Sequence, residues 1–264
     1  MAKLLATLHD QDISIFTVQD AVRILGGDPA TVSNLLGKSE GRGVVTRLRR
    51  GTYIIVPATM GSEPVYAGDP LLVADRLMGD RPHYLSHGTA MAIHGMTVQP
   101  RILVTISCTS PTARSISAQG TEIRVVGIRA EEIFGLEKHW LEPGVSVMTG
   151  DPERTVVDCL RRPDLCGGYP EIDLGAWMQR DKLDPEKLVN YAVRLGIGAV
   201  CGRLGYLMDS CRLGNDDHRK MLRQYLSRAY SLLDPSMSKG GRYASDWKLQ
   251  LNINEDEIEA LRST

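Results

Sequence analysis

Residues 17–56 read TVQDAVRILGGDPATVSNLLGKSEGRGVVTRLRRGTYIIV, and this stretch decides the fold of the N-terminal part of the chain. Thr17 stands three positions before Asp20, a spacing typical of a capping box at the start of a helix. The apolar residues that follow recur at helical spacing and give this helix one buried stripe: Val18, Ala21, Val22 and Leu25. The pattern predicts a short amphipathic helix that begins after Thr17.

A second helix is predicted directly after the first. Gly26 and Gly27 supply a tight turn, Asp28 offers an N-cap, and Pro29 suits the first helical position. The inward residues of this helix are Val32, Leu35 and Leu36, and its outward residues are Ala30, Thr31, Ser33, Asn34 and Lys38. Two short helices joined by a three-residue turn that contains glycine predict a helix-turn-helix, whose second helix lies in the major groove of DNA.

A basic hairpin is predicted after the two helices. Residues 44–56 form two β-rich runs around Arg49-Arg50-Gly51, with glycine where the turn needs a positive φ. Residues 38–50 contain five cations and one acid, a net charge of +4. This arrangement predicts a winged helix; the alternative is a small helical pair with a solvated, charged hairpin. The winged helix predicts the following DNA-binding residues: Thr31, Ser33, Asn34, Lys38, Arg42, Arg47, Arg49 and Arg50.

The composition of the whole chain gives weaker indications than this local pattern. The 264 residues carry a net charge of −1, so the overall charge does not point to a nucleic-acid partner. The small number of aromatic residues (2 Phe, 3 Trp and 9 Tyr) argues against a protein that stacks the bases of single strands. The five cysteines form no C-x-x-C pair, no signal peptide is recognised, and no run approaches the ~18 apolar residues of a membrane span. We therefore expect a cytoplasmic protein with reduced cysteines and no membrane partner.

The fold class predicted for the chain is α+β. We expect an N-terminal winged helix-turn-helix domain over residues 1–60, with an amphipathic first helix, and a Pro- and Gly-rich linker at 57–69. Residues 65–264 are expected to form a larger mixed α/β domain with a helical C-terminal part. Strands are predicted at 84–85, 102–107, 123–126, 145–148 and 247–254, with a hairpin loop at 109–120. Helices are predicted at 70–78, after the N-caps Ser86 and Asp151, at 172–180, 185–195, 199–208 and 218–232, and as a short exposed helix in the acidic tail 255–264.

A second basic segment lies in the C-terminal part of the chain. Residues 218–242 contain six cations and one acid, Asp234, which gives a net charge of +5. The cations form a possible second basic face: Arg219, Lys220, Arg223, Arg228, Lys239 and Arg242. Two interpretations stay open at this point, a solvated helix face and a second patch that contacts phosphates.

Several residues also invite a catalytic interpretation. His87 and His94 are seven positions apart, which is too far on a helix for a shared metal ion, so packing is the simpler role. Asp151 and Glu153 suit the N-terminal end of a helix, and Arg154 can pair with Asp158 one turn later. The cysteines are expected to be buried thiols, and no phosphate-binding glycine motif or nucleotidyltransferase motif is found. We expect no enzyme activity, catalytic residue, metal site or cofactor.

The chain resembles a known family over nearly its whole length. The motifs that carry the resemblance are the helix-turn-helix with its RLRRGTY hairpin, SHGTAMAIHG from Ser86, DPERTVVDCLRRP from Asp151, and RLGYLM from Arg203. Together they resemble the AbiEi antitoxins. The last two motifs are the more specific ones, because winged helices occur in many regulators.

The resemblance implies the antitoxin of a type IV toxin–antitoxin pair. Its N-terminal domain would repress the shared promoter, binding double-stranded DNA with inverted repeats, and its C-terminal domain would oppose a nucleotidyltransferase-like toxin without a stable complex. Two alternatives stay open: a DNA-guided enzyme such as a nuclease or nucleotide-processing protein, and a repressor that senses a ligand. Such an enzyme would need Asp151, Glu153 or Asp158 for metal-dependent turnover.

Overall fold

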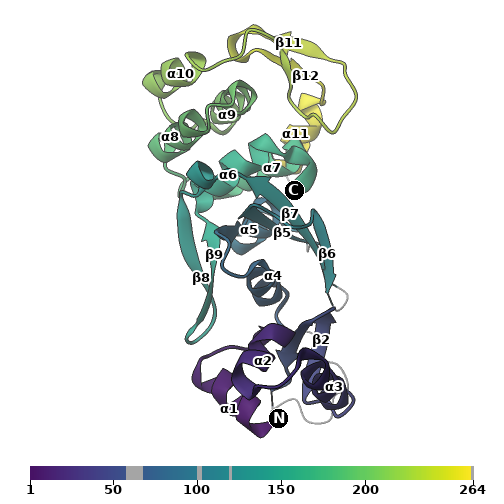
Figure 1. Cartoon of the computed structure of the whole chain (residues 1–264). Coiled ribbons are helices and arrows are strands. Elements are labelled where there is room, and N and C mark those ends of the chain that lie inside the picture. The colour runs from purple at the N-terminus through teal and green to yellow at the C-terminus, as the bar shows by residue number, and fades with distance from the viewer. Residues whose placement is uncertain (58–67, 100–102, 119–120, 263–264) are drawn as a thin grey trace. The chain divides into compact units, whose positions relative to one another are not determined.

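The computed structural model describes residues 1–57, 68–99, 103–118 and 121–262 (Figure 1). The fold is α+β, as predicted from the sequence. The chain divides into two compact units, Met1–Gly79 with Ser115–Ile123, and Asp80–Arg114 with Arg124–Thr264. The predicted domain boundary at 60–65 and most of the predicted linker lie outside the described residues. The helix α4 (Pro70–Met78), predicted for the second domain, belongs to the first of these units.

The first unit begins with three helices and a small antiparallel sheet. Its elements are α1 (Ala2–Asp10), β1 (Ile15–Thr17), α2 (Val18–Leu25), α3 (Pro29–Glu40), β2 (Val45–Arg49) and β3 (Thr52–Ile55), and the sheet order is β1-β3-β2. Leu4 and Leu8 of α1 are fully buried against a core that includes Phe16, Leu36 and Tyr53. The first helix therefore supports this unit, as its amphipathic pattern predicted.

The helix ends of the first unit follow the predicted local chemistry. The Thr17 hydroxyl accepts a hydrogen bond from the Asp20 backbone N–H at 3.2 Å, and the Asp20 carboxylate accepts one from the Thr17 N–H at 2.8 Å. Gly26 and Gly27 adopt φ values of +74° and +90°, which side chains other than glycine rarely allow. Asp28 then caps α3 by accepting from the N–H groups of Ala30 and Thr31. These interactions confirm the predicted capping box, the glycine turn and the second N-cap.

The largest sheet has the strand order β6-β7-β5-β4-β9-β8, and β6 is counted with the first unit. Its strands are β4 (His83–Leu85), β5 (Leu103–Thr109), β6 (Ser115–Ala118), β7 (Thr121–Ile128), β8 (Leu136–Glu142) and β9 (Val145–Gly150). The strands β5, β7 and β9 confirm the predictions at 102–107, 123–126 and 145–148. The prediction of a loop over 109–120 was wrong at β6, where Ile116 and Ala118 alternate inward with two exposed serines. Strand β8 was not predicted, because its charged residues suit the sheet edge and leave little apolar alternation.

Helices make up most of the remaining second unit. They are α5 (His87–Ile93), α6 (Pro152–Arg161), α7 (Tyr169–Gln179), α8 (Pro185–Leu195), α9 (Gly198–Cys211), α10 (Asp216–Arg223) and α11 (Glu255–Arg262), with short 3₁₀ turns at Ala130–Glu132, Pro163–Leu165 and Ser245–Trp247. A small sheet of order β10-β12-β11 follows α10, formed by β10 (Ser231–Leu232), β11 (Arg242–Ala244) and β12 (Leu249–Leu251). A Cβ on Gly205 of α9 would lie 2.2 Å from the Trp247 ring, so the RLGYLM motif needs glycine at this position.

Three predictions for the C-terminal part need correction. The helix predicted over 218–232 ends at Arg223, after which the N–H groups of Gln224, Tyr225 and Leu226 bond to carbonyls three residues back instead of four. Ser231–Leu232 form β10, which pairs with β12, and the Leu232 carbonyl accepts from the buried Arg203 guanidinium at 3.1 and 2.9 Å. The strand predicted over 247–254 is limited to β12. The acidic tail forms α11, but one side of this helix is not exposed: Ile258 is buried, and Arg262 pairs with the fully buried carboxylate of Asp173.

Among the described residues, no helix has both the length and the apolar character needed to cross a membrane.

Candidate nucleic-acid interface

The outward face of α3 carries the residues predicted to meet DNA bases. Val32 and Leu36 point into the core of the first unit, so Ser33, Asn34 and Lys38 are left exposed on the opposite side. Neither Ser33 nor Asn34 makes a side-chain hydrogen bond to another residue in the described part of the chain. Their polar groups are therefore available to a partner.

Thr31 differs from its exposed neighbours on α3. Its hydroxyl donates to the Asp28 carboxylate, the same group that caps the helix. The hydrogen bonds from the Thr31 hydroxyl and backbone N–H lower the pKa of Asp28. Thr31 is thus already engaged in the helix cap, which the sequence-based prediction of a DNA contact did not anticipate.

The hairpin between β2 and β3 positions the predicted phosphate-binding cations. Gly51 adopts φ +79° in the turn, as predicted, and Arg50 beside it is exposed. Arg49 is only half-exposed at the end of β2, and its Nε donates to the Thr52 hydroxyl at 3.3 Å. The two arginines predicted for the hairpin tip therefore differ, since only Arg50 lies in the turn itself.

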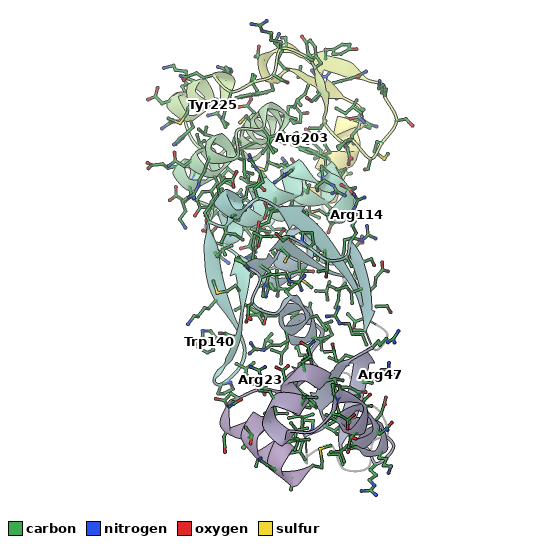
Figure 2. All side chains as sticks on the ribbon, in the orientation of Figure 1. Arg23, Arg47, Arg114, Trp140, Arg203 and Tyr225 are labelled. Carbon is green, nitrogen blue, oxygen red and sulfur yellow. The ribbon has the colours of Figure 1, made fainter. Side chains whose placement is uncertain are left out.

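Two further cations predicted for the interface belong to the first unit. Arg42 is exposed directly after α3, and Arg47 is exposed on β2 (Figure 2). Figure 2 shows Arg23 of α2 well away from Arg47, and Arg23 pairs with Asp20. The candidate interface is therefore defined by Ser33, Asn34, Lys38, Arg42, Arg47 and Arg50.

The salt dependence of DNA binding provides a test of these cations. Arg42 and Arg50 make no ion pair with another described residue, so each is available to neutralise a phosphate. We expect the double substitution Arg42→Ala, Arg50→Ala to reduce the slope of log affinity against log salt by about 0.9 for each phosphate that is no longer neutralised. Fluorescence anisotropy with duplex DNA over a salt series measures this slope, with Lys138→Ala on β8 as the control. An unchanged slope would remove both residues from the interface.

The six cations of the second basic segment differ in their positions and surroundings. Arg219 Nε donates to Asp209 at 2.6 Å, Lys220 pairs with Asp217 at 3.0 Å, and the Arg223 guanidinium lies 4.9 Å from the centroid of the Trp247 ring. Arg228, Lys239 and Arg242 are exposed beyond the end of α10. These six residues therefore do not lie on one helix face, contrary to the prediction of a helix over 218–232.

The carboxylates that an enzyme would need, those of Asp151 and Glu153, accept hydrogen bonds from neighbouring structural groups. Asp151 caps α6 by accepting from the Arg154 N–H at 2.7 Å, and its other oxygen accepts from the Tyr191 hydroxyl at 2.9 Å. Glu153 accepts from the Asp184 N–H at 2.8 Å. Within the described residues, no group of three or more His, Cys, Asp or Glu side chains is placed to hold a metal ion. Nothing in this geometry favours a catalytic interpretation of these groups.

Asp158 belongs to a buried polar network that the sequence showed only in part. Arg154 Nε donates to Asp158 Oδ1 at 3.0 Å, which is the i, i+4 pair predicted from the spacing. The Tyr84 hydroxyl donates to Asp158 Oδ2 at 2.8 Å and accepts from Arg154 Nη2 at 2.7 Å. Burial alone lowers the pKa of Arg154, but Asp158 and Tyr84 outweigh it and the pKa is raised. The network links β4 to α6 through three side chains.

The two histidines of the SHGTAMAIHG motif have separate partners. His94 Nε2 lies 2.7 Å from the Gly150 carbonyl, whereas His87 Nδ1 lies 2.8 Å from the Ser86 hydroxyl. Ser86 stands at the predicted N-cap position, but its side chain does not cap α5; its hydroxyl accepts from the Ser107 hydroxyl at 2.8 Å. Burial lowers the pKa of His87 to about 4. The two rings therefore have different neighbours, a hydroxyl for His87 and a backbone carbonyl for His94.

Exposed tyrosines near the second basic segment were not recognised from the sequence. The side chains of Tyr225, Tyr230 and Tyr243 are all exposed. The small number of aromatic residues in the whole sequence had argued against a protein that stacks bases. The available signal was their alternation with arginines along 223–243, rather than their number.

All five cysteines are buried free thiols, as expected, and burial raises the pKa of Cys201 to about 11.

Comparison with known proteins identifies a fold relative. No family model matches the chain, and no curated protein matches it. Among solved structures, the crystal structure of the RV2827C protein from Mycobacterium tuberculosis is similar, with a TM-score of 0.68 and 16% sequence identity. The match covers 100% of this chain and 94% of that chain. At this identity the similarity is one of fold, and it extends over the whole chain.

Proposed function

We propose that the protein represses transcription by binding promoter DNA through α3 and the β2–β3 hairpin. The observation that carries this proposal is the exposed face of α3, where Ser33 and Asn34 have no side-chain hydrogen bond to a described residue. Cations of the same compact unit accompany this face, with Arg42 and Arg50 as examples. Short polar side chains on a groove-binding helix read base edges, and cations around it hold the phosphate backbone.

The order of elements in the first unit supports the same proposal. A winged helix places a helix-turn-helix before a two-stranded hairpin, and here α2 and α3 precede β2 and β3. The strand β1 pairs with β3, beside the hairpin, and completes a three-stranded sheet. In such an arrangement α3 would enter the major groove while the hairpin turn at Arg50 reaches the adjacent backbone.

We further propose that the protein is the antitoxin of a type IV toxin–antitoxin pair. This part rests on the resemblance to the AbiEi antitoxins, in particular on the DPERTVVDCLRRP and RLGYLM motifs. In the structure these motifs form α6 and α9, in the second unit. The functional partner would be a nucleotidyltransferase-like toxin, opposed without a stable complex, in the cytoplasm.

Asn34→Ala provides the test of the proposed repressor. Asparagine can make a bidentate contact to adenine that is worth ~1–3 kcal/mol of discrimination. We therefore expect the variant to bind operator DNA about tenfold more weakly, with a much smaller loss on random duplex. Competition binding between promoter DNA and random DNA measures this ratio.

A growth assay with the neighbouring toxin separates repression from neutralisation. The Asn34→Ala variant should lose repression of a promoter reporter but still rescue cells that express the toxin. If the variant lost the same affinity for operator DNA and for random DNA, Asn34 would contact only the DNA backbone. Toxicity that persists with the wild-type protein present would contradict the antitoxin assignment while leaving DNA binding intact.

A further inference from the structure

Two exposed tyrosines meet on the small sheet of the second unit. Tyr243 on β11 is 60% exposed, and Tyr230, directly before β10, is 43% exposed. Their ring centroids lie 4.9 Å apart with the ring planes at 74°, an edge-to-face pair. Because β12 separates β10 from β11, the rings meet across the central strand. Single exposed aromatic residues are common on protein surfaces, but a paired set with cations beside it indicates a binding surface.

Cations accompany this tyrosine pair. Lys248 Nζ lies 5.2 Å from the centroid of the Tyr230 ring. The position of Lys248 is fixed by the backbone, because its carbonyl accepts from the Ser231 N–H at 3.0 Å. Arg228 is exposed two residues before Tyr230, whereas Arg242 leaves β11 on the face opposite to Tyr243. Proteins that bind single strands combine such cations, which follow the phosphates, with aromatic rings on which bases stack.

A cleft opens beside Tyr243. It has a volume of about 520 Å³, within the range of small-molecule sites, and Tyr206, Arg242, Tyr243 and Trp247 contribute to its lining. Three carboxylates line it against two arginines, Arg242 and Arg262, so the net charge of the lining disfavours phosphate; the carboxylates are those of Asp209, Asp246 and Glu259. Carboxylates can instead accept hydrogen bonds from the amino groups of bases. The cleft therefore suits a base, while the phosphates remain near the exposed cations.

We propose that Tyr230, Tyr243 and Lys248 form a tyrosine-cation surface that binds single-stranded nucleic acid. Unpaired bases would stack on the tyrosines, and Lys248 would contact the phosphates. A duplex does not fit this chemistry, because its base faces are already stacked on one another. The surface shares no residue with the proposed duplex interface on α3 and the hairpin, so either assignment can hold without the other.

Binding of labelled oligonucleotides to the full chain tests the proposal. The probes are oligo(U) RNA and oligo(dT) DNA of about 12 nucleotides, a length within the usual site sizes. We expect Tyr243→Ala to weaken binding about tenfold and the double variant Tyr230→Ala, Tyr243→Ala more strongly, whereas Tyr243→Phe retains a stacking ring and most of the affinity. Comparison of the RNA and DNA arms shows whether the 2′-hydroxyl contributes.

Trp140→Ala is the matched control. This substitution removes an exposed aromatic ring with Lys138 over it, and Figure 2 shows Trp140 far from Tyr225 within the same unit. It should leave the affinity unchanged. Photocrosslinking of a thiouridine-containing oligonucleotide to the wild-type chain needs no variant, and the crosslinks should map to residues 228–248.

Three results would overturn the proposal. One is equal affinity of the wild type and the double tyrosine variant for both oligonucleotides. Another is a duplex that displaces the probe as effectively as an unlabelled single strand. The third is crosslinks confined to the first unit. The Arg42→Ala, Arg50→Ala variant keeps the two assignments distinguishable, because it should weaken duplex binding and leave single-strand binding intact.

Discussion

Asp158→Ala should lower the free energy of unfolding by about 3–5 kcal/mol, the effect of breaking a buried ion pair from one side. The substitution leaves the Arg154 guanidinium, which is fully buried, without its carboxylate. It also removes the acceptor of the Tyr84 hydroxyl. Chemical denaturation in urea, followed by far-UV circular dichroism, measures the change.

Two further variants make this expectation specific. Asp217→Ala removes the carboxylate of an exposed pair with Lys220, and it should cost less than about 1 kcal/mol. The double variant Arg154→Met, Asp158→Leu removes both buried charges and should be more stable than Asp158→Ala alone. Equal free energies of unfolding for Asp158→Ala and Asp217→Ala would contradict this role of the buried pair. The same holds if the double variant has no higher free energy of unfolding than Asp158→Ala.

Acid should destabilise the protein through His87 before most carboxylates titrate. Burial lowers the pKa of His87 to about 4, whereas an unfolded histidine titrates near 6.5. Between these pH values the unfolded state binds more protons, so the free energy of unfolding falls as the pH falls. The stabilisation is complete above pH ~6.5 and is lost by pH ~4, a change on the order of 3 kcal/mol.

His87→Asn isolates this contribution. His87 adopts φ +52°, a left-handed conformation that asparagine tolerates better than most residues. The variant has no group that titrates in this window at position 87, so its free energy of unfolding should change less between pH 7 and pH 4 than that of the wild type. Urea denaturation of both proteins at several pH values gives the difference. Parallel profiles would show that the imidazole is not the group responsible.

The sequence predicted best where local chemistry determines local structure. Thr17 with Asp20, Gly26-Gly27 and Asp28-Pro29 act within a few residues of one another, and the limits of α2 and the start of α3 followed from them. The same holds for Asp151-Pro152 at the start of α6 and for Gly51 in the hairpin turn. The outward residues of α3 could be named in advance because their inward neighbours are apolar at helical spacing.

The sequence was less informative where distant residues decide the outcome. Residues 231–232, predicted as the end of a helix, instead form a strand that pairs with β12, and the Leu232 carbonyl binds Arg203 of α9. Burial of one side of α11 depends on Asp173 in α7. The approach of Tyr230 to Tyr243 results from strand pairing on both sides of β12, which no pattern of neighbouring residues encodes. The engagement of Thr31 by Asp28 is local, and it could have been predicted from the cap.

The two compact units are not consecutive segments of the chain. The first unit takes residues 115–123 from within the second, so the chain passes between the units three times. A single recombination point near residue 60 would therefore not transfer the first unit as a complete module, since α4 and β6 would come from the other parent. Chimeric proteins built from this fold need two exchanged segments, and their evolution by simple domain shuffling is correspondingly restricted.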